Sequence, residues 1–141
     1  MCSSDLYQHA SYDDVVGEVL DELRESLAFA DGAGIERSRV LVDPGLGFAK
    51  DASQSLEALA RLGEFAELHR PLVVGPSRKS FLTRSFVTPV AASERDWATT
   101  AAVTTAVLQG AHIIRVHAVG PMVHVARVAD EIRRYHRDGD A

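Results

Sequence analysis

Three short segments of the 141-residue chain carry side chains suited to holding a flat ring and an anion. Each segment follows an apolar run. Together the segments supply a carboxylate, several cations and a histidine. If the apolar runs are parallel strands, these groups share one rim, because ligands gather at the carboxyl ends of parallel strands. In chain order the segments are Asp43-Pro44-Gly45-Leu46-Gly47-Phe48-Ala49-Lys50, Gly75-Pro76-Ser77-Arg78-Lys79-Ser80 and Arg115-Val116-His117.

The first segment suits a planar heterocycle. A carboxylate at a strand end, here Asp43, can accept paired N–H donors from such a ring. Gly45 and Gly47 let a ligand approach the backbone, and Phe48 offers a ring face for stacking. The alternative is that Asp43 caps its own loop through an Asx turn.

The second segment is a candidate anion site. Ser77, Arg78 and Lys79 place a hydroxyl, a guanidinium and an ammonium at a predicted helix start, where free N–H groups and the helix dipole favour anions. Arg78 suits a carboxylate, and Lys79 suits a carbonyl or phosphate. The alternative is a solvated basic helix start. Gly75, just upstream at a strand end, favours the functional interpretation.

The third segment places two polar side chains on one face. Arg115 and His117 are two residues apart, so on a strand they point the same way, while Val116 points into apolar packing. A cation and an imidazole arranged so can clamp an oxyanion such as pyrophosphate; alternatively, both satisfy buried backbone groups. The remaining histidines lack paired metal spacing, which favours surface or structural roles: His9, His69, His112, His124 and His136.

Hydrophobic periodicity predicts the elements that position these segments. Helical spacing of apolar residues predicts helices over 12–27, 53–68, 94–109 and 121–134, and a short helix over 80–82. Uninterrupted aliphatic runs predict buried strands at 39–43, 72–75 and 112–117, and residues 85–92 read as a loop. Strands that alternate with helices indicate a parallel α/β fold, either a small open sheet or part of a (β/α)₈ barrel. We assign residues 1–10 to an unstructured leader and 11–138 to this domain.

Composition excludes several other classes of protein. A hydrophobic content of 46% supports a core, and fifteen Lys and Arg against twenty Asp and Glu give a net charge of −5, which disfavours nucleic-acid binding. A single cysteine, Cys2, excludes a disulfide scaffold. No run approaches the roughly 20 apolar residues of a membrane span, and no secretory signal is visible, so a cytoplasmic location is expected. Nucleotide-binding loops and a serine-nucleophile elbow are absent from the sequence.

The three segments, taken in order, resemble the dihydropteroate synthase family. In that family the sixth, seventh and eighth barrel strands end in D-P-G-x-G-F, G-x-S-R-K and R-V-H, which match Asp43 to Phe48, Gly75 to Lys79 and Arg115 to His117. The resemblance covers roughly residues 12–134. It implies a TIM-barrel enzyme that joins p-aminobenzoate to a dihydropterin pyrophosphate in folate biosynthesis, with release of pyrophosphate. The chain then corresponds to strands six to eight and their helices.

The resemblance also implies roles for individual residues. Asp43, Phe48, Gly75 and Lys79 would contact the pterin. Ser77 and Arg78 would lie on the p-aminobenzoate side, and Arg115 and His117 would hold the pyrophosphate. The complete family enzyme uses Mg²⁺, whose ligand residue lies in the half of the barrel that this sequence does not match, so no metal ligand is assigned.

Two departures from the family pattern leave other functions open. Ala118 stands where most relatives have Asp after R-V-H, and Ala49 replaces a common Gly. One alternative is another pterin-binding barrel of the methyltetrahydrofolate methyltransferase type; another is a degenerate, non-catalytic paralogue. Because three strands leave two exposed edges, we expect little or no synthase activity from the chain alone. The same edges leave a homodimer open.

Overall fold

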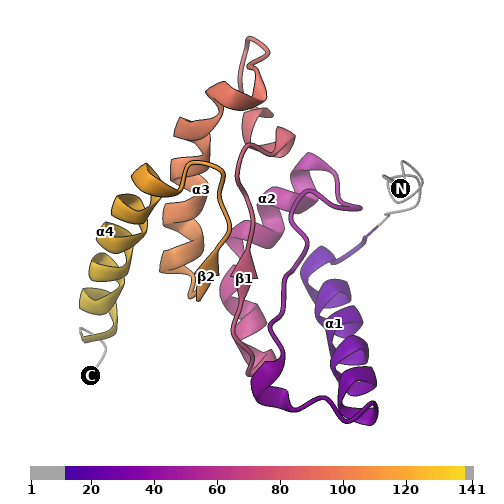
Figure 1. Ribbon diagram of the computed structural model, residues 1–141. Coiled ribbons are helices and arrows are strands. Elements are labelled where there is room, and N and C mark those ends of the chain that lie inside the picture. Colours follow the sequence, from indigo (N-terminus) through magenta and orange to yellow (C-terminus); the bar gives the residue numbers. More distant parts are fainter. Residues whose placement is uncertain (1–11, 139–141) are drawn as a thin grey trace.

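The computed structural model describes residues 12–138, with side chains described as far as Tyr135 (Figure 1). The predicted leader, residues 1–10, lies outside this range. The α-helices are α1 (Val15–Gly32), α2 (Ala52–Ala60), α3 (Asp96–Leu108) and α4 (Val119–Asp138), and the strands are β1 (Val73–Val74) and β2 (Ile113–Ile114). Short 3₁₀ helices lie between them at Arg37–Arg39, Leu62–Leu68, Ser80–Thr83 and Ala92–Glu94.

The sheet is parallel, as the alternation of strands and helices predicts. β1 pairs with β2, with Val73 opposite Ile113 and Val74 opposite Ile114. The predicted strand at 39–43 is reduced to a parallel bridge between Val42 and Leu72. The sheet that the structure describes offers this segment a neighbour on one side only, so most of its backbone groups find no ladder partner. The spatial order is therefore the Val42 segment, β1, β2.

The helix predicted over 53–68 is wrong in its extent. It starts earlier, because Asp51 caps α2: its Oδ1 accepts the Gln54 N–H at 2.8 Å. It ends at Ala60 and is followed by the 3₁₀ helix Leu62–Leu68. In that helix the three buried residues are Leu62, Phe65 and Leu68. Their spacing of three matches the three residues per turn of a 3₁₀ helix, so one face points steadily into the core.

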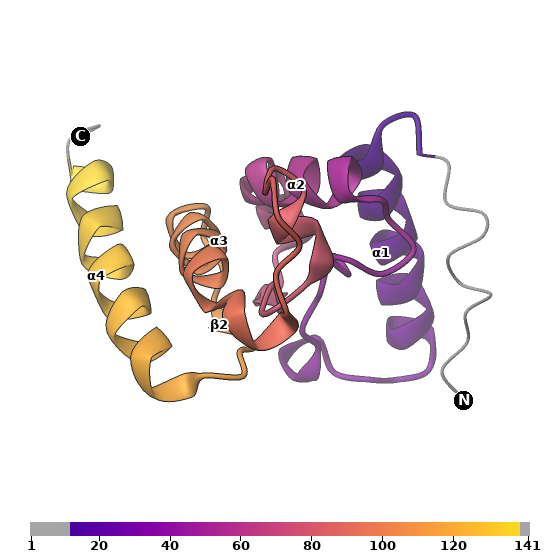
Figure 2. The same ribbon diagram turned by 90° about the horizontal axis from the view of Figure 1, so that it is seen from above.

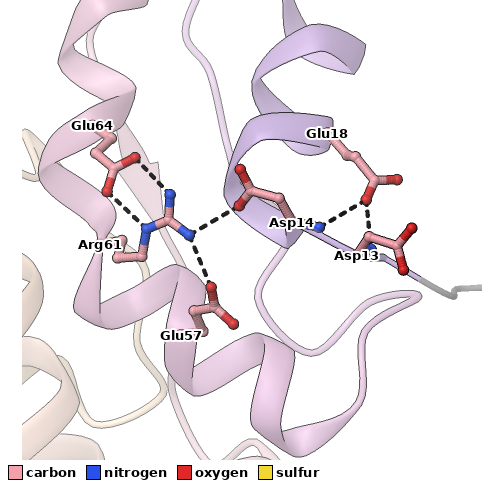
Figure 3. A network of polar contacts seen from close by, with 6 residues as sticks. All are labelled: Asp13, Asp14, Glu18, Glu57, Arg61 and Glu64. Atoms are coloured by element: carbon pink, nitrogen blue, oxygen red, sulfur yellow. Dashed lines mark hydrogen bonds and ion pairs between the residues drawn. The ribbon is translucent and has the colours of Figure 1, made fainter.

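A cluster of ion pairs joins the start of α1 to the end of α2 (Figure 3). The Arg61 guanidinium contacts Glu57 at 2.8 Å, Glu64 at 2.8 Å and Asp14 at 2.9 Å. Asp14 immediately precedes α1, and the other three residues lie in or beside α2. These groups are solvent-exposed, so the cluster fixes the relative orientation of two helices more than it adds stability.

The helices follow one another across the molecule in chain order, with α1 and α4 at opposite ends (Figures 1 and 2). The main core lies between α1, α2, the 3₁₀ helix Leu62–Leu68 and the strands, and includes Val16, Leu62, Phe65 and Val74. A second cluster, with Val103 and Met122, holds α4 against α3. Within residues 12–138 we find no helix with the length and apolar character needed to cross a membrane.

Candidate ligand site at the carboxyl ends of the strands

The loop after the Val42 segment is shaped by two glycines. Gly45 and Gly47 adopt φ of +68° and +72°, a conformation that disfavours residues with a Cβ. A Cβ at Gly47 would lie 3.1 Å from Cδ of Lys79, so the missing side chain also makes room for that lysine. Asp43 Oδ1 accepts the Gly45 N–H at 2.8 Å, which is the Asx turn named above as the alternative. Asp43 is nevertheless exposed to solvent at this rim.

Lys79 brings the second segment against the first. Its Nζ lies 3.5 Å from the centroid of the Phe48 ring, which is itself half exposed. Partial burial lowers the pKa of Lys79, and the nearby positive charge of Arg115 lowers it further, whereas the Asp43 carboxylate raises it. Lys79 therefore lies within electrostatic range of both Asp43 and Arg115, and its contact with the Phe48 ring joins the first two segments.

Gly75 brings the third segment against the second. A Cβ built on Gly75 would lie only 2.8 Å from Nη2 of Arg115, so the absence of a side chain lets the guanidinium rest on the end of β1. Val116, in contrast, packs against the second core cluster. Arg115 and His117 are both exposed, in agreement with the predicted alternation.

Ser77 links the ends of β1 and β2. Its Oγ accepts the backbone N–H of His117 at 3.1 Å and lies 2.9 Å from Nδ1 of the same residue. Ser77 is only 6% exposed. Ser77 is expected on the p-aminobenzoate side and His117 at the pyrophosphate. The Ser77 Oγ therefore links the two predicted subsites directly.

The short helix predicted over 80–82 is confirmed, because a helix begins directly after Lys79, but it is a four-residue 3₁₀ helix, Ser80–Thr83. Arg78 lies outside it and adopts a left-handed φ of +59°. A turn of this length has no appreciable dipole, so the helix-terminus argument for anion binding does not apply here. Any anion at this loop would meet side chains rather than a row of free helical N–H groups.

Three residues near the start of α3 that the sequence did not single out hold Arg78. Its N–H donates to Oγ1 of Thr99 at 3.0 Å, and its carbonyl accepts from Nη1 of Arg95 at 3.0 Å. Its guanidinium bonds both carboxylate oxygens of Asp96, at 2.9 and 3.0 Å. This pairing raises the pKa of Arg78 and lowers the pKa of Asp96. An acidic residue in a first helical turn is so common that its sequence position gives no hint of this partner.

Lys50 contacts the backbone of the first loop. Its Nζ lies 3.5 Å from the Gly45 carbonyl oxygen and 3.4 Å from that of Phe48, and 5.5 Å from the Tyr12 ring centroid. Burial lowers the pKa of Lys50, while the carboxylates of Glu22 and Asp43 raise it. The sequence placed Lys50 in this segment without assigning it a role.

Two further predictions concern the remaining histidines and a metal site. His112 is structural, as predicted, because its Nδ1 accepts the Leu72 N–H at 3.1 Å. Within residues 12–138, no three or more His, Cys, Asp and Glu side chains lie close enough together to hold a metal ion. The site as described is therefore a cationic rim with one carboxylate, Asp43, at its edge.

Comparison with known proteins identifies the class to which this fold and site belong. A family model described as "Pterin binding enzyme" matches residues 2–117, so the chain belongs to the pterin-binding enzyme family. Within that family its relatives are dihydropteroate synthases. The Escherichia coli K12 dihydropteroate synthase is 44% identical over 119 residues, which cover 84% of this chain and 42% of the relative. An Arabidopsis thaliana folate synthesis bifunctional protein is 38% identical over 138 residues, covering 92% of this chain and 28% of the relative.

Solved structures give the same result. Yersinia pestis dihydropteroate synthase in a sulfonamide drug complex superposes with a TM-score of 0.86 at 30% identity, covering 93% of this chain and 47% of that one. The Xanthomonas albilineans enzyme with 4-aminobenzoic acid superposes with a TM-score of 0.83 at 34% identity, covering 92% of this chain and 46% of that one. The chain thus spans about half the length of these structures, and 42% of the length of the E. coli relative.

Proposed function

We propose that this chain is the C-terminal part of a dihydropteroate synthase, which condenses p-aminobenzoate with 6-hydroxymethyl-7,8-dihydropterin pyrophosphate. The observation that carries the proposal is that the ends of three successive parallel segments meet at one rim: Lys79 lies over the Phe48 ring and within electrostatic range of Asp43, and Arg115 lies against Gly75. These are the residues that the ordered motifs of the family single out. Their spatial order, the Val42 segment beside β1 and β1 beside β2, also follows their order in the chain.

The proposed architecture is strands six to eight of a (β/α)₈ barrel. In support, one flank of the molecule is open: a cavity of about 1400 Å³ lies between the 3₁₀ helix Leu62–Leu68, the end of α3, β2 and α4, and its lining includes Ile114, Val116 and Val123. Val119, in the same lining, is 58% exposed. A closed barrel has no free strand edges, so further strands of the barrel would cover this flank.

The proposed chemistry is displacement of pyrophosphate. The aniline nitrogen attacks the pterin methylene carbon, the carbon–oxygen bond to pyrophosphate breaks with its electron pair leaving on that oxygen, and the nitrogen loses a proton. Arg115 and His117 would stabilise the charge that develops on the leaving group. Lys79, Asp43 and Gly75 would contact the pterin, with Phe48 lining the site, and Ser77 and Arg78 would lie on the p-aminobenzoate side.

The proposal also covers the metal, the cellular location and the oligomeric state. The complete enzyme would use Mg²⁺, whereas residues 12–138 hold no cluster of side chains that fits a metal ion. A cytoplasmic location and a homodimer are also part of the proposal. A dihydropteroate synthase is 44% identical over 84% of this chain. This similarity favours the synthase over the two alternative functions, the methyltransferase and the degenerate paralogue.

Ligand titration of the purified chain tests the proposal. We expect 6-hydroxymethylpterin and pyrophosphate to shift the NMR signals of Lys79 and Arg115, and 4-aminobenzoate to bind in their presence. Lys79→Met should abolish the response to the pterin, whereas Lys50→Met, a variant of the lysine beneath the loop, should retain it. Pterin binding with no effect of 4-aminobenzoate would favour the methyltransferase. Absence of any binding would favour the degenerate paralogue.

A further inference from the structure

The loop that follows β1 is held by the N-terminal end of α3 through two separate sets of contacts. Thr99 and Arg95 bond the backbone of Arg78, at its N–H and its carbonyl. Asp96 bonds the side chain of the same residue, through Nε and Nη2. Backbone and guanidinium are therefore fixed by different residues and can be perturbed separately.

The backbone contacts have a clear structural purpose. A φ of +59° is unfavourable for arginine, because its Cβ crowds the neighbouring carbonyl oxygen. Thr99 is buried, and its hydroxyl meets the strained N–H. The Lys79 N–H also donates to the Pro76 carbonyl, at 3.3 Å, and closes the same turn. Asp96, in contrast, bonds only the side chain of Arg78.

The side-chain contact selects which edge of the guanidinium remains available. The bidentate pair consumes the Nε–Nη2 edge and fixes the plane of the group. Nη1, and the outer hydrogen of Nη2, remain for another acceptor, and the side chain keeps 29% of its exposure. Because both oxygens of Asp96 are engaged, the guanidinium has a defined direction before any ligand arrives.

We propose that Asp96 is a positioning residue that presents the free edge of Arg78 to the carboxylate of the arylamine substrate. The inference rests on the proposed function, since it assigns a substrate class to this part of the same site. Asp96 touches no reacting atom and acts through Arg78. It therefore governs affinity for the aromatic carboxylate, and on the pyrophosphate side it acts only through its charge, which lies within electrostatic range of His117.

The test compares Asp96→Asn with a matched control, Asp130→Asn. Asp130 forms an Arg–Asp pair with Arg133 on α4, and its exposure of 35% is close to the 36% of Asp96. For each variant we would titrate inorganic pyrophosphate, and 4-aminobenzoate in the presence of 6-hydroxymethylpterin and pyrophosphate. The exchange rate of the Arg78 Nε–H with water, followed by NMR, reports directly on the guanidinium. The signal is assigned by its loss in Arg78→Lys.

We expect Asp96→Asn to accelerate exchange of the Arg78 Nε–H and to weaken 4-aminobenzoate about threefold to tenfold, as for a charge-assisted bond that loses its fixed direction. Pyrophosphate affinity should not fall, because the variant removes a negative charge within electrostatic range of His117. Asp96→Glu should restore part of the loss, and Asp130→Asn should change neither ligand.

Other outcomes overturn the inference. Unchanged or tighter 4-aminobenzoate binding in Asp96→Asn would mean that Asp96 only neutralises Arg78. Equal losses for both ligands, together with a lower Tm, would mean that the pair is merely structural. If the wild-type chain binds no 4-aminobenzoate, the proposed function is wrong instead. The Nε–H exchange rates then decide by themselves whether Asp96 fixes the guanidinium.

Discussion

Gly75→Ala should move Arg115 without disturbing the fold. The added Cβ would lie 2.8 Å from Nη2, 3.2 Å from Cζ and 3.3 Å from Nε of Arg115, whereas ordinary contacts begin at 3.4 Å. Nη2 must therefore retreat by at least about 0.6 Å to reach ordinary contact. Gly75 does not have a positive φ, so its backbone accepts alanine. Arg115 is exposed and flexible, so the side chain moves rather than the strand.

The expected loss of affinity follows from that displacement. A hydrogen bond to a charged group contributes about 1.5–3 kcal/mol, and its strength falls steeply with distance and angle. Losing about half of this contribution costs about 0.8–1.5 kcal/mol, which corresponds to about fourfold to tenfold in Kd. The free energy of unfolding should change by less than about 1 kcal/mol, because the group that yields is the end of a flexible side chain.

Isothermal titration with inorganic pyrophosphate and urea denaturation measure the two quantities. Gly120→Ala is the matched control: a Cβ there meets nothing within 4 Å, so affinity should be unchanged. Because Gly120 is helical, stability should rise by up to about 1 kcal/mol. Wild-type affinity in Gly75→Ala, with the Arg115 signals unmoved, would refute the reasoning, and a collapse of stability would show that the strand had moved instead.

Three further predictions concern separate contacts. Phe48→Leu removes the ring beneath the Lys79 ammonium and should cost about 0.5–1 kcal/mol of unfolding free energy in urea denaturation, whereas Phe48→Tyr should keep it. Arg61→Met should lower Tm slightly in dilute buffer and not in 1 M salt, because its partners are exposed; a salt-independent loss would indicate lost packing. Lys79 should titrate below its usual 10.5 by NMR, because burial lowers its pKa, and Arg115→Gln should raise that pKa. The Lys79 amine binds its proton more tightly in the unfolded chain than in the folded one, so the free energy of unfolding should rise with pH between the lowered pKa and 10.5. A flat pH profile in this range would contradict the prediction.

The parallel topology could be predicted because its signals are local. Aliphatic runs bounded by proline and glycine mark strands, and the runs at 72–75 and 112–117 do contain β1 and β2. The predicted strands are longer than β1 and β2, because a strand extends only as far as a neighbouring strand supplies hydrogen-bond partners, which its own sequence does not show. The run at 39–43 has the composition of a strand, yet only Val42 pairs in the structure.

In the candidate site, too, the features with local sequence signals could be predicted, and those that depend on distant contacts could not. Asp43, Gly75, Lys79 and Arg115 could be predicted to share one rim because each lies near the carboxyl end of an apolar run, so chain position predicts spatial position. The pairing of Arg78 with Asp96, 18 residues later, could not be found in this way. It depends on how α3 docks against the loop, and an acidic residue at a helix start carries no mark of the partner it will meet.

The contacts divide the cations of this rim into two kinds. Arg78 has a carboxylate partner, Asp96, within bidentate reach. Lys79 and Arg115 instead lie close enough for their like charges to disfavour one another. Such a placement costs free energy in the unliganded protein, and an anion bound between them would reverse the sign of that cost. Asp96 thus offsets the charge of Arg78, whereas Lys79 and Arg115 lie within range of each other's positive charge, so under the proposed function an anion bound between them would relieve that repulsion.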